Sequence, residues 1–170
     1  MKKLLIVVDM QKDFIDGALG TEEARAILPA VAARIDRARA ENCDILFTRD
    51  THDENYLSSA EGKKLPVVHC VQNSEGWQID KSLNTDGAEI LDKPSFGSAA
   101  LGGLVEKRNY DEIELIGLCT DICVISNALL VKAFLPQARV CVRRNCCAGV
   151  TPESHENALK AMAACQIDIL

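Results

Sequence analysis

The sequence lacks long apolar runs, an excess of basic residues and the usual share of aromatics, and each absence excludes something. No uninterrupted apolar stretch approaches the ~18 residues of a membrane-spanning helix. The formal net charge is −6, which argues against binding to nucleic acids or to anionic membrane surfaces. Aromatic residues make up only 4% of the chain, so we expect a core built mainly from Ala, Val, Ile and Leu. With 48% hydrophobic side chains, residues 1–170 have the size and composition of a single domain.

The N-terminal residues do not have the pattern expected of a secretory signal peptide. Met1–Lys3 is followed by the short apolar run Leu4–Val8 and then by Asp9. Such a run is shorter than the roughly 7–15 apolar residues of a signal peptide. We therefore expect a cytoplasmic protein.

Eight cysteines are present, but none belongs to a Cys-x2-Cys pair of the kind that binds structural zinc. The closest groups are Cys119 with Cys123, and the neighbours Cys146 and Cys147. Disulfide frameworks belong mostly to small secreted domains with thin cores, which this chain does not resemble. We expect most of these cysteines to be small buried apolar residues, and the roles of Cys146 and Cys147 stay open.

Short apolar runs alternate with segments of helical periodicity along the chain, which is typical of a parallel sheet covered by helices on both faces. Thr21 is expected to cap the first helix, and Thr151 with Pro152 to open the last. The stretch 51–88 contains prolines, glycines and few apolar runs, which predicts a long functional loop. The predicted strands are 3–8, 43–48, 89–92, 112–117, 138–142 and, as a sixth, 166–170; the predicted helices are 21–40, 98–107, 121–134 and one that begins at 151.

Chemically active side chains follow four of these strands. The first strand leads to Asp9, the second to Asp50, the third to Lys93 and the fourth to the segment Gly117–Cys123. Taken alone, each aspartate is more often a turn or capping residue, and a lysine before proline is usually solvated. Open α/β sheets, however, bind their ligands beyond the carboxyl ends of the strands. The convergence of these groups on one edge therefore favours a functional site.

Cys123 is the best single candidate for a nucleophile. It falls at the start of a predicted helix, where free backbone N–H groups and the helix dipole stabilise a thiolate. A nearby lysine would lower the thiol pKa further, and a carboxylate would accept its proton. The alternative is a buried cysteine that packs the helix against the sheet. The three histidines offer no arrangement typical of a cysteine protease, and we expect His155 to be solvated.

Three segments resemble one known superfamily. Val7-Val8-Asp9-Met10-Gln11-Lys12-Asp13-Phe14 is similar to the N-terminal signature of the isochorismatase-like cysteine hydrolases, which include the nicotinamidases. Gly117-Leu118-Cys119-Thr120-Asp121-Ile122-Cys123-Val124 resembles their nucleophile motif, and Asp92-Lys93-Pro94-Ser95-Phe96 their lysine segment. The similarity covers nearly the whole chain in the expected order.

This resemblance implies a fold and a mechanism. The fold would be a three-layer α/β/α, Rossmann-like domain with a mostly parallel sheet of five to six strands. The catalytic triad would be Asp9, Lys93 and Cys123, which hydrolyse a C–N bond through a covalent acyl-enzyme. Backbone N–H groups of Cys119 and Cys123 would form the oxyanion hole, with a cis peptide between Leu118 and Cys119. Because members without the cysteine hydrolyse a vinyl ether, Cys123 favours amide or ureido chemistry.

The resemblance also implies a divalent metal beside the thiol. Asp50, His52, Glu61 and His69 are similar to the metal-ligand segment of nicotinamidases, where the ion holds a pyridine nitrogen. Two imidazoles and two carboxylates suit zinc, manganese or iron(II). Asp50 and His52 lie two apart in an extended segment, so their side chains are expected on the same side.

The favoured interpretation is a nicotinamidase-like amidase that converts nicotinamide to nicotinate and ammonia, with a small-molecule amide as its partner. Phe14 and Trp77 are candidates for the walls around an aromatic ring, although the chain is poor in aromatics. Relatives are often dimers or larger, so a homo-oligomer is possible. One alternative is a metal-independent hydrolase of another small amide or a ureido compound. Others are a non-catalytic ligand-binding module, or a redox or metal-storage protein that uses Cys119, Cys123, Cys146 and Cys147.

Overall fold

Six parallel strands form the central sheet of the computed structural model, which describes residues 1–170. Their spatial order is β3-β2-β1-β4-β5-β6. The central strand β1 is fully buried from its second residue onward, as expected for an apolar run covered on both faces. The strands are β1 (Lys3–Val8), β2 (Asp44–Asp50), β3 (Glu89–Lys93), β4 (Glu112–Leu118), β5 (Arg139–Ala148) and β6 (Asp168–Ile169).

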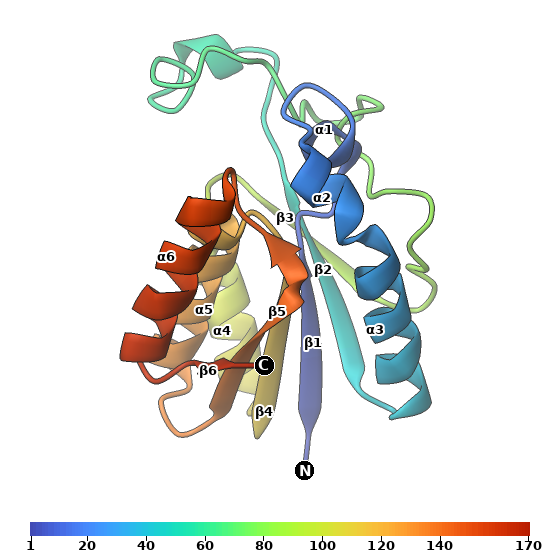
Figure 1. Cartoon of the computed structure of the whole chain (residues 1–170), viewed down its shortest axis with the longest axis vertical. Helices are drawn as coiled ribbons and strands as arrows, with labels where there is room; N and C mark the ends of the chain where they lie inside the picture. The colour runs from blue at the N-terminus through green and yellow to red at the C-terminus, as the bar shows by residue number, and fades with distance from the viewer.

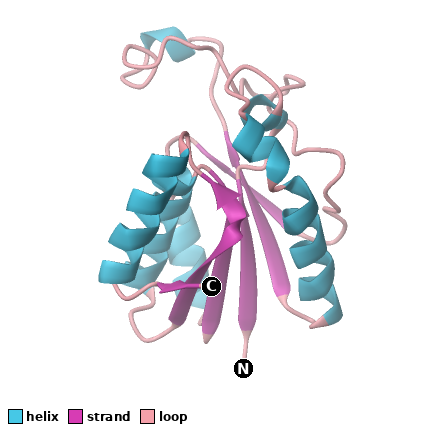
Figure 2. Cartoon of the chain, viewed as in Figure 1, coloured by secondary structure: helices cyan, strands magenta, loops and turns pink.

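Helices cover both faces of this sheet (Figures 1 and 2). The helices α1 (Lys12–Ile15), α2 (Glu22–Ala26) and α3 (Leu28–Ala40) lie on one face. The helices α4 (Ala99–Arg108), α5 (Ile125–Phe134) and α6 (Pro152–Ala164) lie on the other. Alternate side chains of β1 enter the two cores, so that Leu5 and Val7 pack with α3, whereas Leu4, Ile6 and Val8 pack with the other helices. The expected three-layer α/β fold is confirmed, and no helix is both long and apolar enough to cross a bilayer.

Three of the six helices begin at a residue whose side chain accepts a bond from a free backbone amide, and the helices depart from the sequence prediction in two places. Thr21 and Thr151 cap α2 and α6 as expected, each accepting a bond from a backbone N–H of the first turn. The predicted helix 21–40 is wrong as a single element, because it is interrupted at Ile27. Pro29 has no amide hydrogen and cannot continue the hydrogen-bond ladder, so α3 starts anew. The short α1 was not expected.

Two predicted boundaries near the fourth and fifth strands are also wrong. β5 continues to Ala148 instead of ending at Val142, because pairing with β4 resumes at Cys147 after a register shift. The polar residues 143–145 lie at that irregularity, and because they interrupt the apolar pattern, the sequence did not predict that the strand continues. The predicted helix 121–134 begins as a π-helical turn, η2 (Thr120–Val124), before α5. Cys123 therefore lies in a wide turn.

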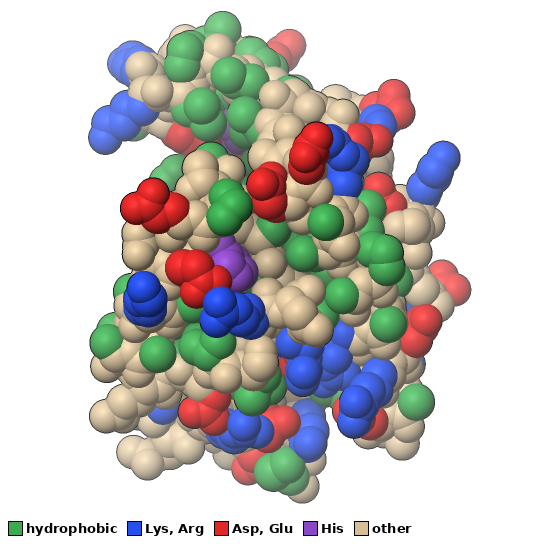
Figure 3. All heavy atoms as spheres, viewed as in Figure 1, with side chains coloured by type: hydrophobic (Ala, Val, Ile, Leu, Met, Phe, Trp, Pro, Cys, Tyr) green, Lys and Arg blue, Asp and Glu red, His purple; other side chains and the backbone are tan.

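The strand order creates a crevice at the carboxyl edge of the sheet. From β1 the chain proceeds outward to β2 and β3, then returns to place β4 on the opposite side of β1. Such a reversal leaves the loops after β1 and β4 diverging, which is where open α/β sheets bind ligands. Within the segment 51–88, residues 53–69 form an arm beyond this edge, with only the 3-10 turn η1 (Tyr56–Ser58) as regular structure, whereas the later residues run back beside α3 to the start of β3 (Figure 1). In the space-filling view the arm stands apart from the body and carries hydrophobic and basic side chains (Figure 3).

Candidate active site and metal centre

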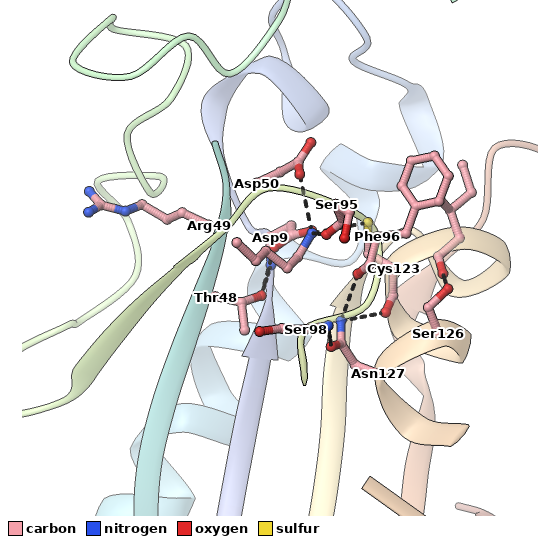
Figure 4. Close-up of polar contacts among 12 residues, drawn as sticks. Asp9, Thr48, Arg49, Asp50, Ser95, Phe96, Ser98, Cys123, Ser126 and Asn127 are labelled. Carbon is pink, nitrogen blue, oxygen red and sulfur yellow. Dashed lines mark hydrogen bonds and ion pairs between the residues drawn. The ribbon is translucent and has the colours of Figure 1, made fainter. Parts of the chain in front are cut away.

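Four strand ends bring the predicted reactive groups together at the carboxyl edge (Figure 4). Asp9 follows β1, and Asp50 and Lys93 are the last residues of β2 and β3. Cys123 lies in the turn that follows β4. The sheet register pairs Asp50 with Lys93 directly. The convergence expected from the sequence is therefore present.

Lys93 is the centre of this cluster. Its side chain is fully buried, and its Nζ lies 2.7 Å from Oδ2 of Asp9 and 3.3 Å from Oδ1 of Asp50. The same Nζ lies 3.4 Å from Sγ of Cys123 and donates to the carbonyl oxygen of Ser95 at 3.0 Å. Burial alone would lower the pKa of Lys93, but the negative charges of Asp9 and Asp50 outweigh it and raise that pKa. Lys93 is therefore a permanent buried cation.

Asp9 is held in one orientation by two partners. The Thr48 hydroxyl donates to Oδ1 at 2.6 Å, while Oδ2 faces Lys93. Asp9 also has a positive φ of 46°, which turns the chain sharply after β1. Burial raises its pKa above the ordinary value, although Lys93 and Thr48 lower it. A carboxylate with a raised pKa is a better proton acceptor.

The pKa of the Cys123 thiol is raised, although the sequence predicted that it would be lowered. Lys93 does lower the pKa of this thiol, as predicted, but burial and the negative charge of Asp9 outweigh it, so that the pKa is well above its ordinary value. The thiol is 4% exposed, and the sequence pattern of a helix start carries no information on that burial. Cys123 therefore rests as a thiol and needs a base. The peptide between Leu118 and Cys119 is cis, as predicted.

Four side chains from two segments form the candidate metal centre. The ligand atoms of Asp50, His52, Glu61 and His69 all lie within 4.8 Å of one another. Nε2 of His52 lies 3.0 Å from Oδ2 of Asp50. Nε2 of His69 lies 3.7 Å from Oδ2 of Asp50 and 3.7 Å from Oε1 of Glu61. Nδ1 of His69 is 2.7 Å from the carbonyl oxygen of Val67, to which it donates, leaving the Nε2 lone pair free. This donor set fits zinc, manganese or iron(II).

A cavity of about 720 Å³ joins the thiol to the metal donors. Its lining includes Cys123, Cys119, all four metal-ligand candidates and Phe14. Trp77 does not line it, so the expectation that Trp77 walls the substrate is wrong. The indole is buried, its Nε1–H donates to Thr51 and the Arg49 guanidinium lies 3.5 Å over the ring. The apolar side of the cavity is formed by side chains from five regions of the chain: Phe14, Leu19, Leu65, Phe96, Ile122 and Val150.

Several residues around the site were missed in the sequence. The fully buried Gln11 donates to the carbonyl oxygens of Asp50 and Trp77 and accepts from the amide of Asp50, which fixes the end of β2. Thr48 is a fully buried polar residue that directly follows the apolar run Ile45–Phe47 of β2, and because Arg49 and Asp50 come next, its position at the polar end of the strand gave no signal. His155, expected to be solvated, is half-buried and its Nδ1 shares a 2.7 Å hydrogen bond with the Thr120 hydroxyl.

The cysteines are all free thiols, and five are buried: Cys70, Cys123, Cys141, Cys146 and Cys147. Burial raises the pKa of each of these thiols. Cys123 differs from the other four because Lys93 contacts it directly.

Comparison with known proteins places the whole chain in one group. The isochorismatase domain model matches residues 3–170. The zinc complex of the pyrazinamidase of Pyrococcus horikoshii has a TM-score of 0.88 and 30% identity, over 100% of this chain and 99% of that chain. An uncharacterized isochorismatase family protein of Bacillus subtilis is 27% identical over 96% of this chain and 95% of its own length. A nicotinamidase of Saccharomyces cerevisiae is 26% identical over 75% of this chain and 80% of its own length.

Proposed function

The chain belongs to the isochorismatase domain family, and we propose that it is a metal-dependent nicotinamidase that uses Asp9, Lys93 and Cys123 to hydrolyse the substrate amide. It is a nicotinamidase-like hydrolase of small-molecule amides. One observation carries the proposal for the catalytic residues. Lys93 contacts both the Asp9 carboxylate and the Cys123 sulfur inside a cavity whose other wall carries the metal donors.

The proton transfer that starts the reaction follows from these contacts. Asp9 takes the proton from Sγ of Cys123, and negative charge moves from the carboxylate to the sulfur. Both atoms lie beside Nζ of Lys93, at 2.7 Å and 3.4 Å, so the charge stays next to the same cation. The net charge of the buried group does not change, which offsets the cost of ionising a buried thiol.

The remaining steps complete one turnover. The thiolate attacks the carbonyl carbon of the amide, and backbone N–H groups of Cys119 and Cys123 donate to the oxyanion. Asp9 returns its proton to the leaving nitrogen, ammonia departs and a thioester remains. Asp9 then takes a proton from water, the hydroxide attacks the thioester, and the acid is released with the thiol restored.

The metal donors support a pyridine carboxamide as the substrate. Asp50, His52, Glu61 and His69 would hold a divalent ion, whose role when bound is to orient the ring nitrogen. The zinc complex of the Pyrococcus horikoshii relative supports zinc as that ion. Phe14 lines the same cavity, with its ring centroid 5.5 Å from that of His69, and offers an apolar face to a ring.

We also propose the domain organisation, the cellular compartment and the partners of the protein. We place the chain in one domain that spans residues 1–170, supported by one sheet with a continuous core on each face. Eight free thiols support a reducing, cytoplasmic compartment. The net charge of −6 supports small molecules rather than nucleic acids or membranes as partners, and a homo-oligomer stays possible.

Ammonia release from nicotinamide, pyrazinamide and a set of carbamoyl compounds tests the proposed function. We expect the wild type to hydrolyse the two ring amides and Cys123→Ala to lose several orders of magnitude in rate, because the acyl-enzyme cannot form. The matched controls Cys165→Ala and Cys43→Ala remove thiols outside the cavity and should leave turnover nearly normal. Full activity in folded Cys123→Ala would refute the mechanism, whereas activity confined to carbamoyl compounds would refute the substrate.

A further inference from the structure

Asn127 is a buried polar side chain for which the proposed mechanism has no use. It lies in α5, one turn after Cys123, and is fully inaccessible to solvent. Asparagine is a poor helix former, and its amide is costly to bury unless its hydrogen bonds are satisfied. Its neighbours on the buried side of α5 are the apolar residues Ala128 and Val131. A polar group in such a place needs an explanation.

The Asn127 amide makes three hydrogen bonds to backbone groups of two different segments (Figure 4). Its Nδ2 donates to the carbonyl oxygens of Cys123 at 2.8 Å and Phe96 at 3.0 Å, and its Oδ1 accepts from the amide of Ser98 at 3.0 Å. Both donor hydrogens are used. Two carbonyls can only accept and one amide can only donate, so only one orientation of the side chain satisfies all three.

The two segments joined by Asn127 carry the two ends of the Lys93–Cys123 contact. Phe96 and Ser98 belong to the loop 94–98 that follows Lys93, and the carbonyl of Ser95 in that loop accepts from Nζ of Lys93. The other segment is the turn η2 that holds Cys123. Apart from the contact of Lys93 with the thiol, every hydrogen bond between the loop and η2–α5 passes through Asn127.

Shape complementarity adds to this link. Gly97 lies so close to α5 that a Cβ there would stand 2.7 Å from Cδ1 of Leu130 and 3.4 Å from the Cβ of Ser126. The loop therefore packs on α5 without a side chain between them, and Asn127 fixes where along the helix it docks. A shift of the loop would move the Ser95 carbonyl, which is one of the groups that aim the ammonium of Lys93.

We propose that Asn127 is a positioning residue that holds the lysine loop against the nucleophile turn and so sets the contact between Nζ of Lys93 and Sγ of Cys123. This inference rests on the proposed role of Cys123 as the nucleophile. It predicts that loss of the amide impairs thiol reactivity more than substrate binding, because the metal donors all lie on other segments and the loop supplies only Pro94, Ser95 and Phe96 to the cavity wall.

The test compares two variants with a matched control. Asn127→Leu keeps the approximate volume and removes all three hydrogen bonds. Asn127→Asp keeps the acceptor for the Ser98 amide but replaces the donor with an oxygen that faces two carbonyls. The control Ser98→Ala removes the hydroxyl that caps α4 at Leu101 but keeps the Ser98 amide and its bond to Asn127. It destabilises the same loop without cutting the proposed link.

Two readouts separate positioning from general destabilisation. The first is kcat and KM for nicotinamide, measured well below the melting temperature of each variant. The second is the rate of alkylation of Cys123 by iodoacetamide relative to that of the exposed Cys165, resolved by peptide mass spectrometry. The second readout needs no substrate. It therefore tests the positioning of the thiol even when nicotinamide is not hydrolysed, and it separates a failure of this inference from a failure of the proposed function.

We expect both Asn127 variants to lower kcat about 10–100-fold with KM changed less than threefold, as for a small misplacement of reacting groups. The alkylation ratio of Cys123 to Cys165 should fall at least about tenfold, while Ser98→Ala leaves that ratio unchanged. The inference is overturned when a folded Asn127 variant keeps both kcat and the ratio within about twofold. It is equally overturned when Ser98→Ala lowers the ratio as much, or when neither Asn127 variant folds, since the residue then serves the fold as a whole.

Discussion

At the scale of single residues, the site is an arrangement of buried charges around one cation. Asp9, Asp50 and Lys93 are each at most 1% exposed, and the two carboxylates share the ammonium group. Isolated charges at such depth would be strongly disfavoured, so each must be paired and hydrogen-bonded. Thr48 supplies the remaining bond to Asp9. The hydroxyl therefore has an effect on the base that can be measured.

Thr48→Val should move the acid limb of the kcat/KM profile to higher pH. Burial already raises the pKa of Asp9, and the Thr48 hydrogen bond lowers it, so loss of that bond raises the pKa further. Only the ionised carboxylate accepts the thiol proton, and a higher pKa means that this form is lost at a higher pH. The measurement is a pH series with nicotinamide, with Thr48→Ser as the control that keeps the hydroxyl. A limb that stays in place or moves to lower pH would contradict this role.

Residue identities in the site were predictable where a motif surrounds them. Asp9, Lys93 and Cys123 each follow a strand within a recognisable segment, and the four metal-ligand candidates do come together. What the sequence could not provide is burial. The thiol pKa depends on how deeply Cys123 lies, and the place of Trp77 depends on Arg49 and Thr51, which are far from it in sequence. Asn127 was missed because its partners are backbone groups, which leave no sequence signal.

At the scale of elements, the end of β4 depends on one glycine. Gly117 has a φ of +116°, and a Cβ there would overlap the carbonyl oxygen of Val8 on the adjacent β1. The two strands therefore leave no room for a side chain at Gly117, just before the chain turns toward Cys123. Helix and strand periodicity predicted that a strand ends here, but the close approach follows only from the pairing of β1 with β4. The end of β5 was also not predictable from periodicity, because its continuation beyond Val142 depends on pairing with β4.

Gly117→Ala should destabilise the protein by at least about 3 kcal/mol, since it combines an unfavourable φ with a clash against backbone. Gly103→Ala is the matched control, because Gly103 lies in α4 and a Cβ there meets nothing within 4 Å. The control should raise stability by about 0.5–1 kcal/mol through helix propensity. Urea unfolding of the two variants measures both effects. Equal stabilities for the two variants would show that the β1–β4 approach is not restrictive.

Three elements are joined by a buried ion pair network away from the site. Glu114 of β4 accepts two bonds from Arg34 of α3, each at 2.9 Å, and one from Arg143 of β5 at 2.6 Å. Burial alone would raise the pKa of Glu114, but the two guanidinium groups outweigh it and hold the pKa below its usual value. The network therefore contributes stability above the ordinary glutamate pKa and loses it as the pH falls through the lower, folded-state value.

Glu114→Gln should lower the free energy of unfolding by about 3 kcal/mol at neutral pH, since it leaves two arginines without their charge partner. The difference between wild type and variant should shrink as the pH falls below 4.5, the usual glutamate value, because Glu114 of the unfolded wild type then binds a proton that the folded state does not yet bind. Denaturant unfolding at a series of pH values provides the measurement. A difference that is constant with pH would mean that the effect of the substitution is packing rather than charge.

At the scale of the whole molecule, the candidate metal centre ties the arm 53–69 to the sheet. Asp50 ends β2, whereas Glu61 and His69 come from the arm. The length of the arm and its lack of regular structure were visible in the sequence, but how it folds back was not. Just after the arm, the chain is fixed to the body by the amide of Cys70, which donates to Asp13, and by a bridge between Gln11 and Ile79. A bound ion would add a link near the far end of the arm.

Metal removal should therefore loosen the arm and stop catalysis without unfolding the sheet. An ion that binds only the folded state, present at 100 times its Kd, adds about 2.7 kcal/mol, so chelation should lower the Tm by roughly 5–10 °C. Hydrogen exchange should rise at residues 53–69 and stay unchanged in β1 and β4, and added zinc should restore both Tm and nicotinamide hydrolysis.

His69→Ala is the control, since it should show the loosened arm with or without EDTA. Less than about a tenth of an equivalent of metal in the purified protein, with full activity and an unchanged Tm in EDTA, would refute the metal centre. The ring nitrogen would then lack the ion proposed to orient it, and an aliphatic amide or ureido compound would become the better substrate.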